Sequence, residues 1–131
     1  MREIKFKGKM DANFPNDKNI IIPKGRWVYG GITFDADRVW IDMQYYGELI
    51  VDKETVGQYT GLKDKNGVEI YEGDIVYDEY SDRNGIIEYS EEDAQFQLII
   101  ENELYNFSDN NGKDFEVIGN IYDNPELLEE E

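Results

Sequence analysis

The sequence has 131 residues, enough for one compact domain or two small units that each bury a hydrophobic core. It contains neither cysteine nor histidine, which excludes disulfides, thiolate chemistry and imidazole catalysis. The formal net charge is −17, and such an excess of acid repels phosphate backbones. We therefore expect no direct binding to nucleic acid.

The charge is unevenly spread along the chain. Residues 1–34 contain seven basic and three acidic side chains, a net charge of +4, whereas residues 35–131 contain six basic and 27 acidic ones, a net charge of −21. Opposite charges at the two ends favour contact between copies, with the basic opening of one chain against the acidic remainder of another.

The first half of the chain has the patterns of short strands. Residues 2–10 alternate between apolar and charged side chains, as a half-buried strand does. A polar loop follows, and a short apolar strand is predicted at residues 20–22. Residues 26–34 predict a strand that is bent or bulged at Gly30-Gly31. Residues 39–41 and 47–51 are further strand candidates, although residues 48–54 fit a helical turn equally well.

Three Asn-Gly pairs punctuate the second half, at residues 66–67, 84–85 and 111–112, and each predicts a hairpin turn. At Asn66-Gly67 we expect a type I′ turn, in which both residues have positive φ. The strands expected around these turns are residues 69–77, 85–89, 95–101, 104–107 and 115–122. In residues 95–100 the side chains alternate, with Phe96, Leu98 and Ile100 on one face and Gln95 and Gln97 on the other. Pro125 and the acids after it predict a short C-terminal helical turn.

These patterns predict a mainly β fold made of short strands and hairpins, with α+β as the alternative. We expect an N-terminal β unit at residues 1–56 and a small barrel-like sheet at residues 57–131, because tight turns between short strands suit such a sheet.

Residues 57–76 read GQYTGLKDKNGVEIYEGDIV, and this run resembles the YopX family. Residues 1–6, 27–30 and 115–128 fit the same family in the same order, whereas Gly8-Lys9 departs from it and residues 78–114 match nothing in it. The resemblance implies a β-rich fold and an origin in a phage or prophage. It implies no catalytic residue and no cofactor.

Catalysis would have to rely on carboxylates, and Glu69, Glu72 and Asp74 are the candidates for a sugar hydrolase or a metal-dependent hydrolase. With 30 acids in the chain, however, such groupings arise without function, and we favour solvated surface carboxylates. Residues 109–114 have acids like a calcium loop, but the glycine stands at the fourth position instead of the sixth, so a turn is favoured. No enzyme, metal or cofactor is predicted.

Tyrosine is abundant, and cross-strand packing accounts for most of the ten. A minority suit a contact patch, because half-buried aromatic rings are common at protein interfaces. The candidate interaction residues are Trp27, Tyr29, Tyr59, Glu69, Tyr71, Glu72 and Asp74.

Three functions are weighed. The leading one is a non-enzymatic phage or prophage accessory protein that acts through protein–protein contact or self-assembly as a homo-oligomer. The second is an acidic mimic of nucleic acid that binds a basic host protein. The third is the carboxylate hydrolase. Because the sequence shows neither a leader peptide nor an apolar membrane span, we expect the host cytoplasm as its location.

Overall fold

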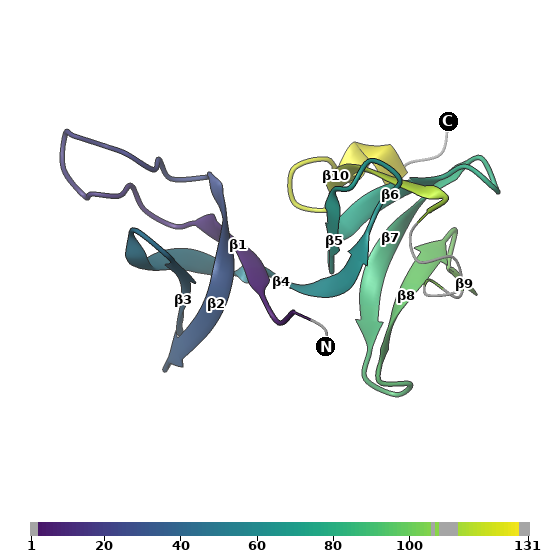
Figure 1. Cartoon of the computed structure of the whole chain (residues 1–131), viewed down its shortest axis with the longest axis horizontal. Coiled ribbons are helices and arrows are strands. Elements are labelled where there is room, and N and C mark those ends of the chain that lie inside the picture. Colours follow the sequence, from purple (N-terminus) through teal and green to yellow (C-terminus); the bar gives the residue numbers. More distant parts are fainter. Residues whose placement is uncertain (1–2, 106, 108–112, 129–131) are drawn as a thin grey trace. The chain divides into compact units, whose positions relative to one another are not determined.

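The computed structural model describes residues 3–105, 107 and 113–128, and it confirms the predicted mainly β class (Figure 1). The chain divides into two units, Met1–Tyr59 and Thr60–Glu131. The elements are β1 (Phe6–Met10), β2 (Trp27–Asp35), β3 (Arg38–Met43), β4 (Gly47–Lys63), β5 (Glu69–Tyr71), β6 (Asp74–Asp78), β7 (Arg83–Ser90), β8 (Gln95–Ile100), β9 (Glu103–Tyr105), β10 (Phe115–Asn120) and a 3₁₀ turn (Pro125–Leu128).

In the first unit, four antiparallel strands pair in a ring. β1 pairs with β2 and also with β4, β2 pairs with β3, and β3 pairs with β4. The ring is completed because β2 changes partner along its length, with Trp27–Gly30 beside β1 and Gly31–Asp35 beside β3. The change falls at Gly30-Gly31, where the sequence predicted a bend. A Cβ atom on Gly30 would lie 2.2 Å from the backbone oxygen of Asp42, so only glycine allows this approach.

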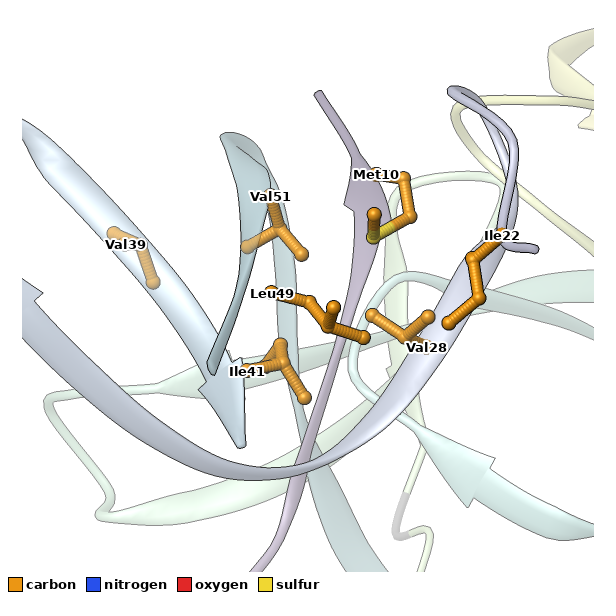
Figure 2. Packing of buried hydrophobic residues seen from close by; sticks show 7 residues of the cluster. All are labelled: Met10, Ile22, Val28, Val39, Ile41, Leu49 and Val51. Atoms are coloured by element: carbon orange, nitrogen blue, oxygen red, sulfur yellow. The ribbon is translucent and has the colours of Figure 1, made fainter. Parts of the chain in front are cut away.

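The core of the first unit lies inside this ring, and its side chains point toward one another (Figure 2). Leu49 and Val51 enter it from β4, so residues 48–54 form a strand and the helical alternative is wrong. The expected strand at residues 20–22 is also wrong, since Ile22 forms only an isolated bridge with Phe14. The buried core residues are Met10, Ile22, Val28, Val39, Ile41, Leu49 and Val51.

The second unit contains a five-stranded antiparallel sheet in the order β10-β6-β7-β8-β9, and β4 continues into this unit to pair with β5. The alternation read in residues 95–100 is confirmed, with Leu98 and Ile100 buried and Phe96 partly buried against the core. The buried core residues are Ile70, Val76, Ile87, Leu98, Ile100, Phe107 and Phe115. Pro125–Leu128 forms a 3₁₀ turn, as the sequence predicted.

The Asn-Gly pairs do not all mark turns. Asn84-Gly85 lies inside β7, so the turn predicted there is wrong. The hairpin itself forms, since β6 and β7 pair antiparallel, but its turn lies at residues 79–82. A Cβ on Gly85 would lie 2.6 Å from Cδ1 of Leu98, and the glycine therefore serves close packing of the core. Asn111-Gly112 lies outside the described residues.

Two further turns differ from expectation. Between residues 64 and 68 only Gly67 has positive φ, 83°, so the turn at Asn66-Gly67 is not of type I′. It is a three-residue loop whose last residue is left-handed. The single strand expected at residues 69–77 is divided into β5 and β6 by a turn at Gly73, where φ is 92°.

The bend in β2 gives a testable contrast between neighbouring glycines. Gly30→Ala should lower the free energy of unfolding by about 1–3 kcal/mol, since its methyl group would overlap a backbone atom that cannot move aside. Gly31→Ala is the control, because nothing lies within 4 Å of a Cβ at that position. Urea denaturation measures both, and equal stability of the two variants would contradict the close approach.

Candidate interaction surfaces

The run GQYTGLKDKNGVEIYEGDIV forms the end of β4, the hairpin turn, β5 and the start of β6. Asp64, at the turn, is buried with 6% of its surface exposed. Its Oδ1 accepts hydrogen bonds from the backbone N–H groups of Asn66 (2.8 Å) and Val68 (2.9 Å). Its Oδ2 accepts one from Val117 of β10 (2.8 Å). One carboxylate thus shapes the turn and fastens it to a distant strand.

Other polar residues of this run also bond to the backbone. The hydroxyl of Thr60 donates to the carbonyl of Ile70 at 2.8 Å, and Oδ2 of Asp74 accepts from the N–H of Tyr71 at 2.8 Å. The phenol of Tyr71 donates to Oε1 of Glu69 at 3.0 Å. These bonds hold the hairpin in shape, so the residues that carry the family resemblance have structural partners.

The structure separates the candidate interaction residues into two groups. Glu69, Tyr71, Glu72 and Asp74 surround the β5–β6 turn of the second unit, where Tyr71 and Asp74 are buried and the two glutamates are partly buried. In the described part of the chain, no three acidic side chains gather as a metal site would require.

The remaining candidates, Trp27, Tyr29 and Tyr59, belong to the first unit. Lys9 pairs with Trp27 across β1 and β2, and Lys7 pairs with Tyr29. The ammonium group of Lys7 lies 4.6 Å from the centre of the Trp27 ring. That of Lys5 lies 5.3 Å from the centre of the Tyr59 ring. Cation–π attraction therefore orders Lys5, just before β1, and Lys7, within it, while Tyr29 remains 47% exposed and Tyr59 is buried.

A groove of about 720 Å³ lies in the second unit. Arg83 borders it and bonds to Oε2 of Glu101 (3.2 Å) and to the phenol of Tyr105 (2.8 Å). The amide of Asn84 donates to the carbonyl of Leu127 at 2.9 Å, which ties the 3₁₀ turn to β7. The lining residues are Arg83, Asn84, Ile86, Ile99, Glu101, Asn102, Leu127 and Leu128.

Three groups of the second unit, the exposed Lys65 and the partly buried Tyr77 and Arg83, have raised pKa values. The hydrogen bond to Tyr105, with a smaller contribution from Glu101, raises the pKa of Arg83. Hydrogen bonding to Glu79 raises the pKa of Lys65, and hydrogen bonding to Asp82 raises that of Tyr77. All three shifts lead away from neutral pH, which suits surface pairs and is opposite to what general acid–base catalysis needs.

A second groove, of about 480 Å³, lies in the first unit. It is mainly apolar, and Phe34 stands in its lining with 70% of its surface exposed. Sequence reasoning missed this groove, although Ile32 and Phe34 continue the alternation of β2 up to the turn. The lining residues are Phe6, Ile32, Phe34, Ala36, Asp37, Val39, Lys53, Glu54 and Val56.

The boundary between the units also divides the charge. Residues 1–59 contain nine basic and nine acidic side chains, whereas residues 60–131 contain four basic and 21 acidic ones. The first unit is therefore neutral, and the second carries the whole net charge of −17.

A ring of four strands, a five-stranded antiparallel sheet and a hairpin held by buried polar side chains define a small two-unit, mainly β protein. Residues 24–129 match the family described as YopX protein, and the chain belongs to this family. It is similar to the crystal structure of protein EF1440 from Enterococcus faecalis, with a TM-score of 0.56 and 26% identity over 98% of this chain and 100% of the other. No curated protein matches the chain. No helix in the described residues is long and apolar enough to cross a membrane.

The Asp64 contacts predict the effect of removing the carboxylate. Asp64→Ala should lower the free energy of unfolding by about 2–4 kcal/mol, because backbone N–H groups would lose charge-assisted partners. Asp64→Asn keeps one acceptor oxygen and should lose less. Glu92→Ala, at an exposed acid, controls for the change in net charge. Chemical denaturation gives the values, and an Asp64→Ala variant as stable as Glu92→Ala would refute the role of the clamp.

Proposed function

We propose that this member of the YopX family is not an enzyme and acts by binding proteins, first of all other copies of itself. The observation that supports the proposal is the division of charge, in which a neutral unit is joined to one of net charge −17. Asp74 and Glu69 are engaged in the contacts that shape the β5–β6 turn, and this favours a structural role for them over a hydrolytic one.

The division of charge decides how copies could meet. Two acidic units repel each other, so contact between copies has to involve the neutral unit on at least one side. The neutral unit can meet the acidic unit of a second copy through its basic residues, or it can meet another neutral unit. Salt weakens the first kind of contact, while it screens the residual repulsion that opposes the second.

We place the protein among the small accessory proteins of phages and prophages, working in the host cytoplasm. This placement rests on the family's association with such genomes. An assembly or adaptor role needs no catalytic residue, which agrees with the contacts of the candidate carboxylates.

Solution mass tests the proposal. We expect the purified chain to exceed the monomer mass in light scattering at micromolar or higher concentration, at low salt, at high salt or at both. The direction of the salt effect then separates the two kinds of contact. A monomer at every concentration under both conditions would remove self-association.

A second function, the acidic mimic of nucleic acid, is favoured by the concentration of 21 acids in residues 60–131. A basic host protein should then be recovered from lysate on immobilised protein and be displaced by added DNA. The exposed run Glu91-Glu92-Asp93 offers a variant, because changing all three to amides should reduce recovery if acid density drives it. Gln44→Ser, at an exposed uncharged position, is the control, and recovery of no basic protein would rule out the mimic.

A further inference from the structure

We propose that the apolar groove of the first unit is a self-complementary docking surface for a second copy of this chain. Phe34 of each copy would enter the groove of the other about a two-fold axis. The inference rests on the proposed self-association and names the surface that performs it.

The register of β2 and β3 shows why Phe34 is unusual. Ile32 lies opposite Ile41, and Phe34 lies opposite Val39. Ile41 and Val39 are buried core residues, and Ile32 packs against the same core. Because alternate residues of a strand share a face, Phe34 lies on the face of β2 that carries Ile32. It is nevertheless 70% exposed, since β1 accompanies β2 only as far as Gly30.

The groove continues the core toward the surface. Phe6, Ile32 and Val56 line it and also pack against the buried cluster, and Val39 belongs to both. Figure 2 shows Val39 on β3 at one side of this cluster. An apolar side chain that entered the groove would therefore extend an existing core.

The charged residues that line the groove, Asp37, Lys53 and Glu54, form its rim. An irregularity in the pairing of β1 with β4 shapes the part of the rim that contains Lys53 and Glu54. The register shifts between Lys7 and Lys9, and the hydroxyl of Thr55 fills the gap by accepting from the N–H of Lys9 (2.9 Å) and donating to the carbonyl of Asp52 (2.6 Å). The N–H of Glu54 bonds to Oδ1 of Asp52 at 3.1 Å. These bonds fix the backbone at residues 52–55, so the rim residues Lys53 and Glu54 sit on an ordered segment.

The charges of the rim favour a second copy as the occupant. The rim contains the basic Lys53 and the acidic Asp37 and Glu54, so it carries both positive and negative charge. In a dimer with two-fold symmetry, the rim of one copy contacts the rim of the other. The basic residue of each copy can then face an acidic residue of its partner, and this contact occurs twice. The neutral unit also lets copies approach where net repulsion is smallest. A strongly basic partner would be drawn instead to the acidic second unit.

The contact is expected to be weak. One aromatic side chain and one groove per copy cover less than the roughly 800 Å² per partner that a standard interface buries. Dissociation constants in the micromolar range or higher follow, and association should persist or strengthen as salt screens the charge of the acidic units.

Sedimentation equilibrium over a concentration series at low and high salt tests the surface. Phe34→Ser should weaken dimerisation by at least about tenfold, as loss of a central aromatic contact does. Tyr45→Ser is the matched control, because Tyr45 is an exposed aromatic of the same unit, at 89%, outside the groove. Because both side chains are exposed, the variants should unfold at the wild-type urea midpoint at concentrations where the chain is monomeric.

A mixing experiment tests the two-fold symmetry. Lys53→Glu makes all three rim charges negative. The double change Asp37→Lys with Glu54→Lys makes all three positive. Each variant alone should dimerise less than the wild type, whereas an equimolar mixture should form mixed dimers. Failure of the mixture to restore association would overturn the symmetric arrangement.

The outcomes separate this inference from the function on which it rests. If the wild type, Phe34→Ser and Tyr45→Ser all dimerise equally well, the groove is not the contact surface, but the proposed self-association is supported. If salt abolishes the association and Phe34→Ser leaves it unchanged, the basic residues of one copy contact the acidic unit of another. This result also overturns the groove as the docking surface. A wild-type monomer throughout overturns both.

Discussion

The structure of the second unit depends on one buried carboxylate. Asp64 accepts two hydrogen bonds within its own turn and a third from β10, more than fifty residues later in the chain. A buried charge is tolerated only where hydrogen bonds replace the water it loses, and here the backbone supplies them. The turn and the β10 strand are therefore fixed together, and the bond from the N–H of Lys65 to the carbonyl of Phe115 adds to this attachment.

The two units are both built from antiparallel strands, but different interactions hold them together. In the first, glycine at position 30 lets β2 pass close to β3, and the ring of strands encloses a small aliphatic core. In the second, polar side chains bonded to the backbone fix the hairpin, and the acids at the surface concentrate the net charge. A neutral unit and a strongly acidic unit are thereby combined in a chain of only 131 residues.

Much of the fold was predictable because local patterns agree with it. The alternation in residues 95–100 and the bend at Gly30-Gly31 are local signals, and the structure follows both. Asn84-Gly85 misled because glycine also serves close packing inside a sheet, and only the distant Leu98 shows that need. Asp64 and the groove around Phe34 were missed for the same reason, since their partners lie on other strands and sequence spacing does not identify them.

The buried Asp64 suggests that proteins related to this chain share its fold more closely than its binding partners. Residues 57–76 are the signature that carries the family resemblance, and its polar members Thr60, Asp64 and Asp74 bond to the backbone. These side chains therefore serve folding, whatever the protein contacts. Relatives that share the signature can therefore inherit an architecture while their outer surfaces diverge. In the proposed self-association, the side chains that select the partner, such as Phe34 and Lys53, lie outside the signature.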